Sequence, residues 1–154
     1  MTAKWGEITA RGIISAIDGE LMAGNPESPL MGISTDSREI IPGQFFWALQ
    51  GERYDGHVFV KQAVEKGASG IVIHKGYGPE IPPGRDLVVI AVKDTLIALG
   101  DLAGWWRHQH NVRVAAITGS VGKTTTKEMT ANILELDTTT LKNSGNLNNL
   151  VGLP

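Results

Sequence analysis

The stretch that decides the fold is AAITGSVGKTTTKEM, residues 115–129, which places two glycines and a Lys-Thr pair between an apolar run and a helix-forming run. Gly119 and Gly122 allow a tight loop whose backbone N–H groups converge on an anion, and the following helix directs its partial positive charge to the same point. In such a loop the Lys123 amine reaches the β- and γ-phosphates of a nucleotide, and the Thr124 hydroxyl is a ligand for Mg²⁺. The stretch therefore predicts a phosphate-binding loop.

This loop departs from the general P-loop pattern of Gly, four residues and Gly-Lys-Ser/Thr, because Ile117 stands where the first glycine would be. Glycines between a strand and a helix also serve ordinary tight turns, but the Lys-Thr pair directly after the loop favours a phosphate site. The candidate ATP-binding residues are Thr118, Gly119, Ser120, Val121, Gly122, Lys123, Thr124 and Thr125, and Lys123 and Thr124 are the candidate catalytic residues. Thr125, Thr126 and Lys127 either touch phosphates or simply begin the helix.

Hydrophobic periodicity and turn signals around this loop indicate an α/β protein. The pattern predicts helices within residues 7–20, 57–68, 94–110 and 123–136, and strands at 32–35, 45–49, 70–75, 87–92, 112–118 and 138–141. Trp105 and Trp106 fall beside leucines at helical spacing and are expected to be packing anchors. The strand–loop–helix unit must start a new sheet, so we expect a small domain over residues 1–93 and a second region over residues 94–154.

The composition excludes several classes of protein. Of 154 residues, 42% are hydrophobic and 19% are charged, which is typical of a globular chain. The formal net charge of −2 gives no reason to expect a nucleic-acid partner. The longest apolar run, residues 87–92, is too short to span a membrane, and the N-terminus has no secretory pattern. The absence of cysteine excludes disulfides. We expect a cytoplasmic protein and a monomer.

Two further polar stretches are candidate binding sites. The stretch STDSR offers hydroxyls, a carboxylate and a guanidinium just past a predicted strand, which suits uracil-ribose or a diphosphate. The same side chains also suit turn capping and an Asp-Arg pair, and the residues leave both open. The asparagine cluster near the C-terminus favours a site over loop hydrogen bonding. The candidate residues are Ser34, Thr35, Asp36, Ser37, Arg38, Asn146, Asn148 and Asn149. By contrast, Asp55-Gly56-His57 is typical of a turn and helix cap.

Three stretches together resemble the Mur ligases, the enzymes that build the peptide stem of bacterial cell-wall precursors. TGSVGKTTTKEM resembles their ATP loop, although folylpolyglutamate synthases carry a similar one. Residues 34–59, STDSREIIPGQFFWALQGERYDGHVF, are similar to the N-terminal domain that binds the UDP end of the substrate. The terminal SGNLNNLVGLP and the KEM after the loop are similar to segments of the family's D-alanyl-D-alanine-adding member.

The resemblance implies a fold, a reaction and roles for these residues. The fold is a small substrate domain followed by the first βαβ unit of a P-loop, Rossmann-like ATPase domain. The reaction joins D-alanyl-D-alanine to UDP-N-acetylmuramoyl-tripeptide through an acyl phosphate, with ATP and Mg²⁺ as cofactors. The glycine loop would hold ATP and Mg²⁺, STDSR would face the UDP-muramoyl substrate, and the asparagines would lie near the peptidyl end of that substrate.

The same resemblance implies parts that 154 residues do not supply. An acidic Mg²⁺ ligand on a later strand and a C-terminal domain that holds adenine and the dipeptide have no counterpart here. We therefore expect the chain to be an N-terminal part of such a ligase and to be inactive by itself. Two alternatives stay open. One is a folylpolyglutamate-type ligase or small P-loop kinase, and the other is a non-catalytic module that binds a UDP-sugar or a partner protein.

Overall fold

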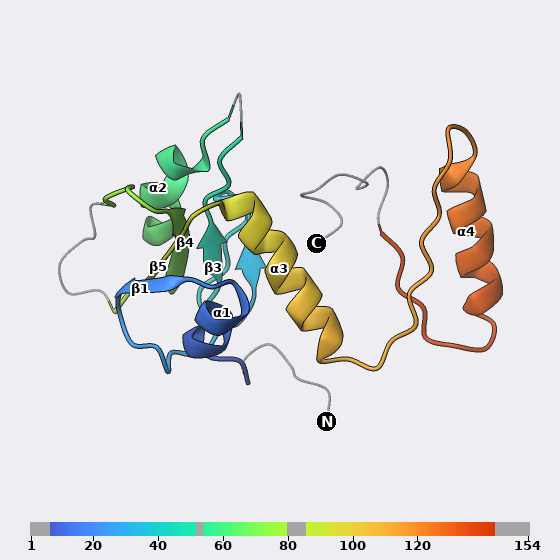
Figure 1. Cartoon of the computed structure of the whole chain (residues 1–154), viewed down its shortest axis with the longest axis horizontal. Helices are drawn as coiled ribbons and strands as arrows, with labels where there is room; N and C mark the ends of the chain where they lie inside the picture. Colours follow the sequence, from blue (N-terminus) through green and yellow to red (C-terminus); the bar gives the residue numbers. More distant parts are fainter. Residues whose placement is uncertain (1–6, 52–53, 80–85, 144–154) are drawn as a thin grey trace. The chain divides into compact units, whose positions relative to one another are not determined.

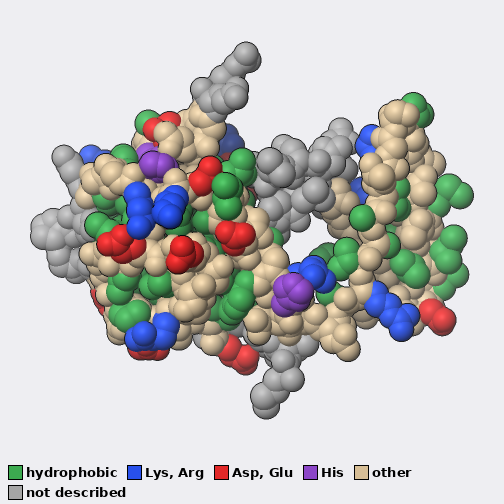
Figure 2. Space-filling view, in the orientation of Figure 1, with side chains coloured by type: hydrophobic (Ala, Val, Ile, Leu, Met, Phe, Trp, Pro, Cys, Tyr) green, Lys and Arg blue, Asp and Glu red, His purple; other side chains and the backbone are tan. Residues whose placement is uncertain are grey.

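The computed structural model describes residues 7–51, 54–79 and 86–143 (Figure 1). The chain divides into two compact units, Met1–His110 and Asn111–Pro154. No helix among the described residues is long and apolar enough to cross a membrane. On the face of the first unit seen in Figure 2, basic and acidic side chains are interspersed rather than gathered by sign.

The first unit is built on a five-stranded sheet with the order β1-β5-β4-β3-β2. Its strands are β1 (Glu20–Ala23), β2 (Ile33–Ser34), β3 (Phe45–Trp47), β4 (Gly70–His74) and β5 (Val88–Val92). Strands β2 to β5 are parallel to their neighbours, and β1 joins β5 at the edge in the antiparallel sense. The remaining elements are helices α1 (Ala10–Ala16), α2 (Val60–Glu65) and α3 (Thr95–His108), and the 3₁₀ helix η1 (Gly56–Phe59).

Both faces of the sheet are buried at β3, β4 and β5, which explains why these three strands read as continuous apolar runs. In β3 the side chains of Phe45 and Trp47 enter one core cluster, with residues of α1 and α3. The side chain of Phe46 enters a second cluster, with residues of α2. All three aromatic side chains are fully buried. Helices therefore cover the parallel strands on both sides, as the α/β pattern predicts.

Most of the predicted elements of this unit are confirmed, with two differences. Strand β1 was not predicted, because ELMA is short and its side chains are exposed or only half-buried. Helix α3, capped by the Asp94 carboxylate as expected, was assigned to the second region but packs in the first unit. Its Leu99 and Leu102 enter the same core as Trp47, and Trp105 and Trp106 pack against that core as predicted.

In the second unit, helix α4 (Lys123–Leu134) follows the glycine loop, as predicted. The strands expected at 112–118 and 138–141 are not formed in the part of this unit that the structure describes. Their apolar side chains, including Val114 and Leu141, are exposed by 66% and 99%. A strand is stabilised by the ladder of a neighbouring strand, and no such neighbour lies beside these described segments.

Candidate functional site

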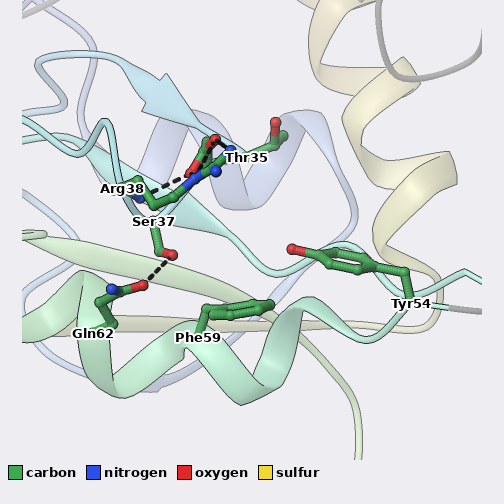
Figure 3. Close-up of a pocket in the computed structure, with 7 residues that line it drawn as sticks. Thr35, Ser37, Arg38, Tyr54, Phe59 and Gln62 are labelled. Atoms are coloured by element: carbon green, nitrogen blue, oxygen red, sulfur yellow. Dashed lines mark hydrogen bonds and ion pairs between the residues drawn. The ribbon is translucent and has the colours of Figure 1, made fainter.

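A cavity of about 490 Å³ lies in the first unit, next to the segment that follows β2 (Figure 3). Its lining residues are Thr35, Asp36, Ser37, Arg38, Tyr54, Phe59 and Gln62. The first four follow the carboxyl end of β2, and the others come from the chain between β3 and the middle of α2. The crevice outside the carboxyl ends of parallel strands is where ligands bind in open α/β sheets. Four of the five residues of STDSR therefore line a cavity at the place where a ligand is expected.

The STDSR segment is a capped turn with an Asp-Arg pair, which confirms that interpretation, and its contact with a ligand stays a prediction. The Ser34 hydroxyl accepts the Asp36 N–H at 3.1 Å, and the Asp36 carboxylate accepts the Arg38 N–H at 2.8 Å. The Arg38 guanidinium donates to both Asp36 oxygens, with its Nη2 at 2.6 Å from Oδ2. The Arg38 side chain is nevertheless 79% exposed. The turn thus presents a positively charged group beside the cavity.

The hydrogen bond from the Arg38 side chain is the main cause that lowers the pKa of Asp36 from its ordinary 3.8 to about 2. Because folding lowers this pKa, the ionised Asp36 carboxylate stabilises the folded form at pH values above 3.8. This stabilisation is lost as the pH falls through about 2. We expect the NMR titration of the Asp36 carboxyl carbon to have its midpoint near pH 2. In Arg38→Ala the midpoint should rise toward 3.8. An unchanged midpoint in that variant would show that Arg38 is not the cause.

The lining of the cavity also contains a polar pair, Ser37 and Gln62, and an aromatic pair, Tyr54 and Phe59. The buried Ser37 hydroxyl donates to Gln62 Oε1 at 2.6 Å. The rings of Tyr54 and Phe59 are stacked, with centroids 5.8 Å apart and planes 21° apart. In Figure 3 the Tyr54 hydroxyl points toward the space beside the Ser37–Gln62 pair. Sequence reasoning missed Tyr54, Phe59 and Gln62, because their shared cavity depends on chain segments that only the fold brings together.

The glycine loop has the backbone that its sequence requires. Gly122 has φ +81° and precedes the first residue of α4, and Gly119 has φ +154°. These values lie where L side chains are strained, so glycine is needed at both positions. The Lys123 ammonium donates to the Gly119 carbonyl and so folds back over the loop. The other predicted loop contacts, Thr118, Ser120, Val121, Thr124 and Thr125, are exposed.

The predicted metal and asparagine sites stay predictions. No group of three or more His, Cys, Asp or Glu side chains that could hold a metal ion occurs within the described residues. Thr124 begins α4 and is exposed, so its hydroxyl fits Mg²⁺ as one oxygen ligand among several. The predicted Asn146, Asn148 and Asn149 lie outside the described residues.

Family profiles match most of the chain. The one described as "Mur ligase family, catalytic domain" matches residues 29–107, and "Mur ligase middle domain" matches residues 117–154. The UDP-N-acetylmuramoyl-tripeptide–D-alanyl-D-alanine ligase of Escherichia coli is 42% identical over 147 residues, covering 96% of this chain and 31% of that protein. The ligase of the same name from Bacillus subtilis is 39% identical over 150 residues, covering 95% and 32%.

Solved structures agree with these relatives. A crystal structure of MurF from Acinetobacter baumannii matches with a TM-score of 0.82 and 39% identity, covering 94% of this chain and 31% of that one. The MurF ligase from Thermotoga maritima in complex with ADP matches with a TM-score of 0.65 and 31% identity, covering 79% and 27%. The chain spans about a third of the length of the relatives it matches. From its sequence, its profiles and its fold, the chain belongs to the Mur ligase family.

Proposed function

We propose that the full-length gene product joins D-alanyl-D-alanine to UDP-N-acetylmuramoyl-tripeptide, using ATP, in the synthesis of peptidoglycan precursors. The observation that carries this proposal is the 42% identity, over 96% of the chain, to a ligase named for that reaction. In this proposal the first unit binds the UDP end of the substrate, and the loop of the second unit binds ATP. ATP and nucleotide-linked sugars are used in the cytoplasm, so we place the activity there.

The cavity of the first unit supports uridine diphosphate as its ligand. The exposed Arg38 guanidinium has donors beyond those that bind Asp36, and planar guanidinium groups suit phosphate oxygens. The stacked Tyr54 and Phe59 supply an aromatic surface for a flat base. Gln62 can turn its amide toward the polar edge of that base. A volume of about 490 Å³ lies within the usual range for small-ligand pockets.

The glycine loop supports phosphoryl transfer from ATP. The Lys123 amine would exchange the Gly119 carbonyl for the nucleotide phosphates, and the loop amides and the start of α4 would add further positive potential. The Thr124 hydroxyl would be one ligand of Mg²⁺, which would supply charge neutralisation at the phosphates. The substrate carboxylate attacks the γ-phosphorus and ADP leaves. The amine of D-alanyl-D-alanine then attacks the acyl phosphate, and phosphate leaves as the amide forms.

Calorimetric titration of UDP into the 154-residue chain tests the nucleotide pocket. We expect saturable binding, because the cavity and its lining lie within this chain. Tyr54→Ala should weaken the binding roughly tenfold, since it removes one stacking surface. Lys93→Ala is the matched control, because Lys93 is exposed and does not line the cavity. Absence of UDP binding by the unaltered chain, or equal affinities of the three proteins, would contradict this assignment.

A further inference from the structure

Two buried polar side chains, Thr95 and His57, hold the turn that carries Tyr54. We propose that they are positioning residues for the nucleotide pocket. They act by fixing its aromatic wall, which is the stacked pair of Tyr54 and Phe59, before the ligand binds. This inference rests on the proposed binding of UDP at that cavity. Neither side chain lines the cavity, and both are almost fully buried, with exposures of 1% and 3%.

The turn that carries Tyr54 leads from β3 to η1 and is closed by backbone hydrogen bonds. The Gly51 N–H donates to the Tyr54 carbonyl at 2.8 Å, and the Gly56 N–H donates to the Leu49 carbonyl at 2.7 Å. Gln50 and Asp55 face each other in an antiparallel bridge. The place of the Tyr54 ring against Phe59 therefore depends on where the two ends of this turn are held.

Thr95 holds the first end of the turn. As the first residue of α3, it accepts the Gln50 N–H on its Oγ1 at 3.0 Å. Its carbonyl accepts the indole N–H of Trp47 at 2.7 Å. Removal of the hydroxyl leaves the Gln50 N–H without this acceptor, so the hydrogen bond that ties Gln50 to α3 is lost. The first end of the turn is thus fixed to the start of α3.

His57 holds the second end. Its Nε2 accepts the backbone N–H of His74 at 2.9 Å. Because Nε2 is an acceptor, the ring proton of the neutral imidazole lies on Nδ1. Nδ1 donates this proton to Asp55 Oδ1, 2.5 Å away. The His57 carbonyl accepts the Tyr77 hydroxyl at 3.1 Å. The backbone and side-chain hydrogen bonds from His57 lower the pKa of Asp55, which therefore stays ionised as an acceptor near neutral pH. The second end is thus fixed to the end of β4.

These contacts restrict the motion of the aromatic wall before a ligand arrives, so less conformational entropy is lost when the ligand binds. A flexible turn would have to be ordered at the moment when the base stacks on Tyr54, and that entropy would be subtracted from the affinity. Here α3 and β4 fix the two ends independently of any ligand. Thr95 and His57 therefore act through Tyr54 and not by touching the nucleotide.

The experiment compares Thr95→Val, which keeps the shape but removes the acceptor, with Thr95→Ser, which keeps the hydroxyl. Two quantities are measured for each protein: the exchange rates of the Gly51 and Gly56 amides without ligand, and the UDP affinity by calorimetry. Thr95→Val should exchange faster at both amides and bind UDP on the order of tenfold more weakly. Thr95→Ser should stay within about twofold of the unaltered chain. If Thr95→Val does not fold, His57→Asn replaces it, because asparagine keeps a donor for Asp55 but does not reach the His74 N–H, and His57→Gln is its control.

A double substitution separates positioning from general stability. In a Tyr54→Ala background, Thr95→Val should cost no further UDP affinity, because the wall it positions is gone. Equal affinities of Thr95→Val and Thr95→Ser, or an undiminished loss in that background, would overturn the inference. If the unaltered chain binds no UDP while only Thr95→Val speeds the exchange, the proposed UDP binding is contradicted and the anchoring of the turn is supported.

Discussion

Lys123→Ala in the full-length gene product is expected to lower ATP-dependent ligation by roughly 10²- to 10³-fold or more and to leave binding of the UDP substrate unchanged. The amine is the one positive side chain in the TGSVGKT loop, and it already lies over that loop against the Gly119 carbonyl. In the proposed mechanism, its removal takes away a charge that stabilises the γ-phosphoryl group during transfer. UDP binding is assigned to the other unit and should not depend on it.

The measurement is phosphate release with all substrates present, paired with calorimetric binding of UDP. Lys93→Ala serves as the control, because Lys93 is an exposed lysine outside the loop. Near-normal turnover of Lys123→Ala would remove the loop from the mechanism. A parallel loss of UDP binding would show instead that the two sites are coupled.

Trp47→Ala is expected to destabilise the first unit by about 3–5 kcal/mol, the usual cost of truncating a large buried aromatic side chain. Trp47 is fully buried in the cluster that joins β3 to α1 and α3. Its indole N–H also donates to the Thr95 carbonyl at 2.7 Å, which links β3 to the start of α3. The variant therefore loses packing on one face of the sheet and the hydrogen bond between Trp47 and Thr95, which lies next to the turn that carries Tyr54.

Urea unfolding followed by far-UV circular dichroism measures this loss, and Trp47→Phe separates its two parts. Phenylalanine removes the N–H but keeps most of the apolar volume, so its cost should be smaller, about 1–2 kcal/mol. A cost below about 1 kcal/mol for Trp47→Ala would contradict the tight packing of this side chain.

The sequence predicted the first unit well because its signals are local and strong. The β-branched runs at residues 70–75 and 87–92 form β4 and β5, and Asp94 caps α3 through the N–H groups of Leu96 and Ile97. The boundary of the unit could not be read in the same way. Whether α3 packs with the sheet before it or after it depends on which core receives its leucines, and no local pattern encodes that choice.

In the candidate site too, some features could be predicted from local sequence and others depend on the fold. The backbone of the glycine loop and the polar STDSR turn were predictable, because their residue types suit particular backbone conformations. Tyr54, Phe59 and Gln62 were not, since each has an ordinary role in a turn or helix when read alone. Only the fold of β3, η1 and α2 brings them to one cavity. Thr95 and His57 are harder still, because their roles consist of hydrogen bonds to distant backbone groups.

The most direct measurement is a ligation assay of the full-length gene product with ATP, Mg²⁺, UDP-N-acetylmuramoyl-tripeptide and D-alanyl-D-alanine, followed by mass spectrometry. We expect one amide product, the UDP-N-acetylmuramoyl-pentapeptide, formed in step with released phosphate and absent when any one substrate is omitted. Failure to form this product, together with ATP-dependent addition of glutamate to a folate, would contradict the assigned reaction.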